Sequence, residues 1–219
     1  MSSPNAKESH SAWDRIRIAF HRRTSHYHRI DVLTQALAPH VGRGATLLDL
    51  GCGDLRLAAA LHRERELARC VGADIWPLRV APPAGLEYRQ IENNAALPWG
   101  DDAFDVVTLV DTLHHSVDAD ALLREALRVG RRVLIKDHFE YGRISRGLLQ
   151  FLDYLGNRAY GVPTPGHYFT PASFDQLVHA AAPGWRAEVT LGIDLYGHLP
   201  LGRWLLPPRL HFVATLRPL

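Results

Sequence analysis

Short apolar runs alternate along the chain with segments whose apolar residues recur at three- and four-residue spacing. The runs predict buried strands, and the spaced segments predict amphipathic helices. Strands are expected at residues 45–50, 70–74, 86–90, 104–110, 132–136, 185–190 and 211–216. Helices are expected at residues 13–39, 54–67, 118–129, 144–160 and 170–182. Because the two kinds of segment alternate, we predict an α/β fold around a largely parallel sheet.

Residues with known capping preferences mark several of these helix ends. Asp118 is expected to be an N-cap, and Gly130 is expected to stop the same helix. Thr170 is an expected N-cap that is followed by Pro171 at the first helical position. The last two strand candidates are separated by a segment, about 191–210, that is too long for a tight hairpin. This apolar, aromatic segment is predicted to be a lid or substrate loop, a dimer contact or a membrane-facing surface, in that order.

The composition is that of an ordinary globular protein. The 219 residues are 47% hydrophobic and 22% charged, which favours a single domain. We divide it into an N-terminal tail and helical cover, 1–43, and a main unit, 44–219. The net charge of +2 is too small to imply nucleic-acid binding by itself, so the arginine-rich N-terminal helix is taken as a solvated face. Two cysteines without metal spacing, no apolar leader and no membrane-length run favour a cytoplasmic protein.

The first strand candidate ends in a glycine turn, Gly51-Cys52-Gly53, that precedes a helix. Glycine lets the backbone bend sharply there and lets a ligand approach closely. A dinucleotide fingerprint would need a small residue at Arg56, so an adenosyl cofactor without phosphates fits better. Asp49 can face the amine end of a cationic ligand. Asp74, at the end of the next strand, can accept hydrogen bonds from both hydroxyls of a ribose.

Residues 46–138 resemble the class I S-adenosylmethionine-dependent methyltransferases, especially the branch called methyltransferase type 11. The resemblance rests, in order, on Leu48–Gly53, Val71–Asp74, Asn93–Trp99 with Phe104–Val107, Asp111–His115, and Leu122–Val129 with Val133–Ile135. It implies a Rossmann-like seven-stranded, mostly parallel sheet with flanking helices and an antiparallel last strand. It also implies S-adenosyl-L-methionine as the cofactor.

The matching positions imply a set of cofactor contacts. They are Asp49, Gly51, Cys52, Gly53, Asp74, Ile75, Asn93, Asn94, Asp111 and His114. The chain departs from the family pattern at Leu55, where a third glycine is usual, and at Asn93, where an acid usually binds the adenine amino group. For Asp111, a role in bracing a loop is an equal alternative.

The thirteen histidines suggest candidates for acid–base chemistry. His115 and His138 follow the fourth and fifth strands at the cofactor edge, and we predict that they are catalytic. Tyr141, His167 and Tyr168 are predicted to bind substrate. We assign no metal ligands. The alternative is a site in which oxygen and imidazole groups gather at one rim, from Asp111, His114, His115, Asp137 and His138.

These features together predict methyl transfer from S-adenosylmethionine to the oxygen, nitrogen or carbon of a small, apolar or aromatic acceptor. Two alternatives stay open: an inactive cofactor-binding or scaffold protein of the same fold, and an RNA methyltransferase. The segment after the fourth strand lacks the Asn/Asp-Pro-Pro-aromatic loop of many base-modifying enzymes, which makes nucleic acid an unlikely partner. A homodimer is compatible with the sequence.

Overall fold

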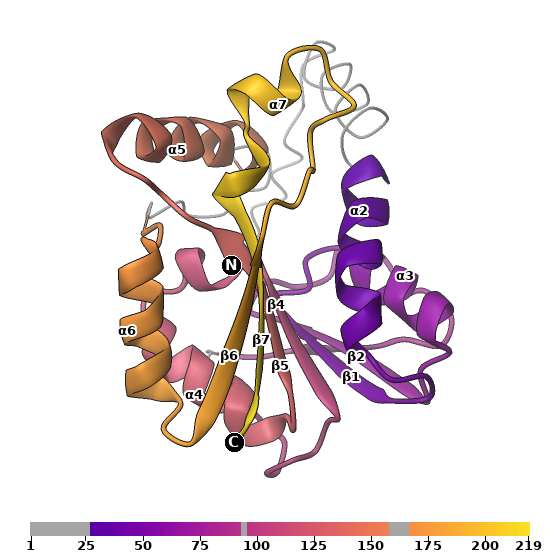
Figure 1. The fold of residues 1–219 in the computed structure, drawn as a ribbon. Coiled ribbons are helices and arrows are strands. Elements are labelled where there is room, and N and C mark those ends of the chain that lie inside the picture. Colours follow the sequence, from indigo (N-terminus) through magenta and orange to yellow (C-terminus); the bar gives the residue numbers. More distant parts are fainter. Residues whose placement is uncertain (1–26, 93–95, 158–166) are drawn as a thin grey trace, which may run out of the picture.

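A seven-stranded sheet forms the centre of the molecule (Figure 1). The computed structural model describes residues 27–92, 96–157 and 167–219. The strands are β1 (Thr46–Leu50), β2 (Arg69–Asp74), β3 (Glu87–Gln90), β4 (Val106–Val110), β5 (Val133–His138), β6 (Trp185–Leu191) and β7 (His211–Pro218). The helices are α2 (Tyr27–Leu37), α3 (Arg56–Arg65), α4 (Ala119–Val129), α5 (Arg143–Asn157), α6 (Pro171–Ala181) and α7 (Gly202–Leu205).

The strand order is β3-β2-β1-β4-β5-β7-β6. Strands β1 to β5 pair in parallel, whereas β7 runs antiparallel to both β5 and β6. The predicted mostly parallel sheet with an antiparallel last strand is therefore confirmed. The order reverses at β1, whose neighbours are β2 and β4, and this is the place where open α/β sheets bind ligands.

Helices cover both faces of the sheet. The core on one face includes Leu33 and Leu37 of α2 and Leu61 of α3, and the core on the other includes Leu123 of α4 and Phe174 of α6. Figure 1 shows α5 and α7 beyond one end of the sheet. Because side chains alternate along a strand, Leu48 and Leu50 of β1 face α4 and α6, while Leu47 and Asp49 face α2 and α3.

The predicted caps of α4 and α6 are present. The Asp118 carboxylate accepts from the Ala121 amide at 2.9 Å, and Thr170 and Ser173 form a reciprocal capping box. Gly130 follows α4 as expected, but its φ is −123°, outside the left-handed region. A Cβ at Gly130 would lie 2.4 Å from Val107 Cγ2, so the glycine serves close packing of the helix end against β4.

Several element ends differ from the sequence prediction. Helix α3 spans 56–65 rather than 54–67, because Leu55 and Glu66 at its two caps are left-handed. Strand β4 begins at Val106, and Phe104 forms only an isolated bridge. Strand β6 runs on to Leu191, so the expected insertion covers 192–210. The described part of the N-terminal helix, α2, ends at Leu37, and its expected residues 13–26 lie outside the described ranges.

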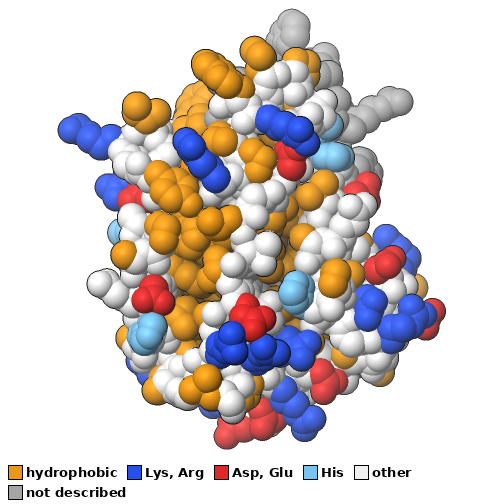
Figure 2. All heavy atoms as spheres, viewed as in Figure 1, with side chains coloured by type: hydrophobic (Ala, Val, Ile, Leu, Met, Phe, Trp, Pro, Cys, Tyr) orange, Lys and Arg blue, Asp and Glu red, His pale blue; other side chains and the backbone are white. Residues whose placement is uncertain are grey.

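The insertion between β6 and β7 contains α7 and a 3-10 helix, Pro208–Leu210. Trp204 of α7 is 79% exposed. Figure 2 shows apolar side chains gathered on the face that carries α6 and β6. A groove of about 260 Å³ lies there, lined by residues that include Phe174, Val189 and Leu191. Within the described ranges, every helix is too short or too polar to cross a bilayer.

Candidate active site

The glycine turn after β1 bends as its sequence predicts. Gly51 and Gly53 have φ values of +72° and +54°, a region that favours glycine. A Cβ on Gly51 would lie 2.5 Å from Thr112 Oγ1, whereas a Cβ on Gly53 would meet nothing within 4 Å. The Asp74 carboxylate accepts from the amides of Gly53 at 3.0 Å and Trp76 at 3.1 Å. These two hydrogen bonds fix the end of β2 beside Gly53, where the backbone is open to close approach.

Leu55 replaces the usual third glycine without loss of packing. It adopts φ +63° and is fully buried. A left-handed non-glycine residue costs about 1–2 kcal/mol. Its side chain fills the space over Gly72 of β2, because a Cβ at Gly72 would lie 2.0 Å from Leu55 Cδ2 and 2.8 Å from Cys52 Sγ. The chain thus has leucine where the family has its third glycine, and Gly72 in the neighbouring strand leaves room for that leucine side chain.

Asp49 is a buried acid, and no cation is among the described groups that shift its pKa. It is 3% exposed, and it accepts a 2.6 Å hydrogen bond from Thr108 Oγ1. Burial raises the pKa of Asp49 to about 7; the Thr108 hydrogen bond opposes this, and the negative charges of Asp74 and Asp54 add to it. A cationic group placed beside this carboxylate would favour its ionised form.

The other predicted cofactor residues near the turn differ in burial. Ile75 is 42% exposed directly after Asp74. Cys52 is buried, and burial raises the pKa of its thiol far above the ordinary value, which is unfavourable for a nucleophile. Asn93 and Asn94 lie outside the described residues.

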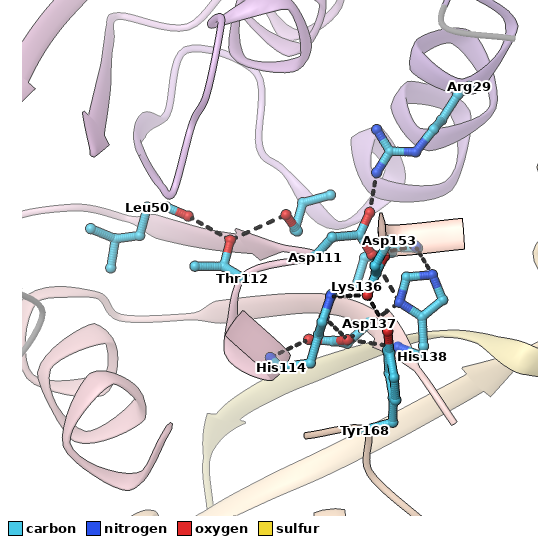
Figure 3. A network of polar contacts seen from close by, with 11 residues as sticks. Arg29, Leu50, Asp111, Thr112, His114, Lys136, Asp137, His138, Asp153 and Tyr168 are labelled. Carbon is cyan, nitrogen blue, oxygen red and sulfur yellow. Dashed lines mark hydrogen bonds and ion pairs between the residues drawn. The ribbon is translucent and has the colours of Figure 1, made fainter. Parts of the chain in front are cut away.

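Asp111, at the end of β4, is held by two protein cations (Figure 3). Lys136 of β5, which is fully buried, places Nζ 2.5 Å from Oδ1, and the Arg29 guanidinium of α2 bonds Oδ2. Burial opposes ionisation of Asp111, but the charges of Lys136 and Arg29 outweigh it and hold its pKa well below the ordinary value. Both carboxylate oxygens are engaged, which favours the bracing alternative for Asp111.

His114 lies between two acids (Figure 3). Its Nδ1 is 2.6 Å from Asp137 Oδ1, and its Nε2 is 3.3 Å from Asp153 Oδ2. Burial lowers the pKa of His114, but the charge of Asp137 and hydrogen bonds to both acids raise it to about 10, so the ring is an imidazolium. The Tyr168 hydroxyl donates to Asp153, and its ring stacks on His114 with centroids 5.4 Å apart.

Three other histidines of this region are neutral at pH 7. Burial lowers the pKa of His115, and the charge of His114 adds to this. Burial and the charge of Lys136 lower the pKa of His138, whose Nε2 lies 3.5 Å from Lys136 Nζ. His211, with its ring centroid 4.8 Å from that of His138, has a pKa well below the ordinary value for the same reasons.

The structure brings most of the predicted acceptor-side residues together. Asp111, His114, Asp137 and His138 form one connected network with Asp153 and Tyr168, and His115 packs against His114 with centroids 4.0 Å apart. Tyr141 and His167 are exposed instead, and the Tyr141 hydroxyl donates to the Arg209 carbonyl at 3.3 Å.

Sequence reasoning missed Arg29, Lys136 and His211 as members of this region. Lys136 could have been found from the sequence, because it directly follows the apolar run Val133-Leu134-Ile135 in a strand that is buried on both faces. A lysine in such a strand needs a partner. Arg29 and His211 had none, because one is an ordinary helical arginine and the other begins a strand at the far end of the chain.

Comparisons with known proteins show which family part of this chain resembles. Residues 48–133 match the model of the protein family described as a methyltransferase domain. The resemblance to the type 11 branch of the class I S-adenosylmethionine-dependent methyltransferases is therefore confirmed, and S-adenosylmethionine is the cofactor of that class.

The curated relatives match only part of the chain. A demethylmenaquinone methyltransferase of Mycolicibacterium paratuberculosis is 36% identical over 92 residues, which is 42% of this chain and 39% of that protein. The Thermus thermophilus enzyme of the same name is 38% identical over 101 residues, or 41% and 46% of the two chains. The chain thus spans less than half the length of these relatives.

Solved structures match the fold along nearly the whole chain. A putative methyltransferase of Haloferax volcanii, solved with the Trm112 methyltransferase activator, has a TM-score of 0.68 at 16% identity and covers 94% of this chain and 95% of its own. A Thermotoga maritima S-adenosylmethionine-dependent methyltransferase, described as a possible histamine N-methyltransferase, has a TM-score of 0.62 at 15% identity, with the same coverage. At this identity the likeness establishes the fold.

Proposed function

We propose that the protein transfers the methyl group of S-adenosylmethionine to a small-molecule acceptor. The observation that carries the proposal is Asp49, a buried carboxylate whose pKa is raised to about 7, beside an open glycine turn where the strand order reverses. The cofactor carries an ammonium and a sulfonium. Either positive charge could pair with the Asp49 carboxylate, on which no cation of the described residues acts. A dinucleotide would bring phosphates to the same place and would be repelled.

The residues at the turn fit this cofactor. Asp74 offers a carboxylate, anchored by two backbone amides, that can accept from the ribose hydroxyls. Gly53 leaves room for close approach, and the exposed side chain of Ile75 lies next in sequence to Asp74. We place Gly51, Cys52, Asn93 and Asn94 around the adenosyl part and keep His114 and Asp111 at the methionine end. The bound cofactor supplies a methyl group activated for direct displacement.

The acceptor side is formed by the neutral histidines. A general base must be unprotonated at the working pH before it can accept a proton. Burial lowers the pKa of His115 and of His138, which favours this unprotonated form in both rings. We therefore propose both as catalytic residues that receive a proton from a hydroxyl or acidic carbon of the acceptor. Tyr141, His167 and Tyr168 are proposed to contact the rest of that molecule.

An apolar or aromatic acceptor is favoured by the segment 192–210. Leu195, Leu206 and Leu210 of this segment are buried, whereas Leu201 and Trp204 are exposed beside them. The names of the curated relatives make demethylmenaquinone the first acceptor to test. An inactive scaffold remains the second candidate function. Its support is the two departures from the family pattern, Leu55 and Asn93. The packing of Leu55 over Gly72 weakens the first, since the fold of the turn is preserved.

Calorimetry with S-adenosylmethionine, followed by turnover assays with labelled cofactor, tests the proposal. We expect binding below millimolar concentration and transfer of label to an organic-soluble product. No binding in that range would refute the enzyme function. Binding without turnover across many acceptors would favour the scaffold, and salt-sensitive transfer to RNA would favour an RNA methyltransferase. A soluble cytoplasmic location and a homodimer are proposals that fractionation and light scattering would test.

A further inference from the structure

Two imidazole nitrogens and one carboxylate oxygen converge between the end of β4 and helix α5. They come from His114, His115 and Asp153, and these ligand atoms all lie within 4.8 Å of one another. Nδ1 of His115 is buried and has no hydrogen-bond partner among the described residues. His114 itself is buried, with a relative exposure of 1%, and its Nε2 faces Asp153 Oδ2 at 3.3 Å.

From this geometry we propose that His114, His115 and Asp153 form a binding site for one divalent transition-metal ion. Imidazole ligands favour ions such as Zn²⁺, Co²⁺ or Fe²⁺ over Mg²⁺ and Ca²⁺, which prefer oxygen ligands. Two histidines and one carboxylate leave at least one coordination position open.

The second layer of contacts is that of a metal site. Histidines that bind metals almost always donate their other ring N–H to a carboxylate or carbonyl, which orients the ring. Asp137 holds Nδ1 of His114 in this way at 2.6 Å, which leaves Nε2 to face the ion. The Tyr168 hydroxyl donates to Asp153 Oδ2, the same oxygen that faces Nε2 of His114. The contacts from Asp137 and Tyr168 thus orient two of the three proposed ligands, His114 and Asp153.

A neighbouring cluster is less suitable for an ion. His114, Asp137 and His138 also lie within 4.8 Å of one another through their ligand atoms, but all three are buried. Lys136 Nζ lies 3.5 Å from His138 Nε2 and would repel a cation. By contrast, the Asp153 side chain is 17% exposed and His115 is half-buried, so this cluster lies closer to solvent.

The local charge also suits a divalent cation. Arg29 and Lys136 are both paired with Asp111, whereas Asp137 and Asp153 both contact the ring of His114. A bound ion would replace the proton that Nε2 of His114 presents to Asp153. Ligand atoms of a tetrahedral site with bonds of about 2.1 Å lie about 3.4 Å apart, so His115 and the end of α5 must move inward slightly.

The metal site and the proposed catalysis share His115. An imidazole that binds a metal through one ring nitrogen keeps its proton on the other and is not a base, so in the loaded protein the base would be His138. Metal binding is nevertheless measured without cofactor or acceptor. Its outcome is therefore independent of whether the chain transfers methyl groups.

Titration of the full chain with Co²⁺ and Zn²⁺ tests this site. We expect one Co²⁺ per chain, with a visible d–d absorption band, and a rise in the thermal midpoint that depends on metal concentration. The variants Asp153→Asn and His115→Gln should each weaken binding at least about tenfold. Asp153→Asn keeps an acceptor for Tyr168, so its fold should be preserved; circular dichroism without metal would verify this.

The matched control is His179→Gln, which removes an exposed histidine of α6. It should bind metal as the unmodified chain does. Absence of stoichiometric binding up to about 1 mM would overturn the proposal, because such affinity corresponds to only about 4 kcal/mol. Equal binding by folded Asp153→Asn, folded His115→Gln and the unmodified chain would overturn it as well, since the ion would then be held elsewhere.

Discussion

Replacement of Asp49 by asparagine should stabilise the protein without cofactor and weaken its binding of S-adenosylmethionine. The asparagine side chain keeps an oxygen that can accept from Thr108 but never carries a charge. The pKa of Asp49 is about 7 in the folded chain against 3.8 for an ordinary aspartate. At about 1.4 kcal/mol per pH unit, ionising this buried group costs roughly 4 kcal/mol at pH 8.

The sign of the pH dependence follows from which state binds more protons. The folded pKa lies above the unfolded value, so between about pH 4 and 7 the folded chain holds a proton that the unfolded chain has released. Stability without cofactor should therefore fall as pH rises through this window and level off above it. Because such energies vary with context by factors of two to three, we expect a gain of about 1–4 kcal/mol for Asp49→Asn at pH 8.

Urea unfolding at pH 5 and pH 8, combined with calorimetry of cofactor binding, measures both effects. The control is Asp105→Asn: hydrogen bonds from the Thr46 amide and hydroxyl lower the pKa of Asp105, so its loss should destabilise near neutral pH. A drop in the unfolding free energy of Asp49→Asn at pH 8 would refute the burial argument. Unchanged cofactor affinity would refute the assignment of Asp49 to the cationic end of the ligand.

Three further substitutions probe the turn, the buried ion pair and the acceptor side. Gly72→Ala places a methyl 2.0 Å from Leu55 Cδ2 and should cost about 1–3 kcal/mol in urea unfolding, part of which Leu55→Ala in the same chain should restore. Lys136→Met leaves the half-buried Asp111 with one cation and should cost about 3–5 kcal/mol; adding Asp111→Asn should recover stability, and no recovery would show that the pairing is not the cause. His138→Ala should lower turnover about 10²–10⁴-fold with cofactor affinity unchanged, and full turnover would exclude it as the base.

Much of the fold could be predicted because its signals are local. The apolar runs of β1, β4 and β5 sit in the sheet where periodicity predicts strands, and Asp118 and Thr170 cap helices as their residue types predict. The prediction of α3 was two residues too long at each end, because Leu55 and Glu66 take a left-handed conformation that no propensity assigns to them. At Leu55 the tertiary reason is the space that Gly72 leaves open.

The candidate site was predictable in its location but only partly in its contacts. Asp49, Gly51 and Asp74 are brought together by the parallel pairing of β1 and β2, which follows from the order of the elements. Asp111 was predicted equally as a cofactor contact or a brace. The structure favours the brace through Lys136 and Arg29, which lie 25 and 82 residues away in sequence.

The sequence by itself thus determined the alternation of strands and helices, the glycine turn and the acids beside it, because these depend on residue type and short spacing. Only the tertiary structure decided which charges are buried together. It turned His114 into an imidazolium between Asp137 and Asp153 and left His115, His138 and His211 neutral. The protonation of a histidine depends on burial and on charges within a few ångströms, and those neighbours come from elements far apart in the chain.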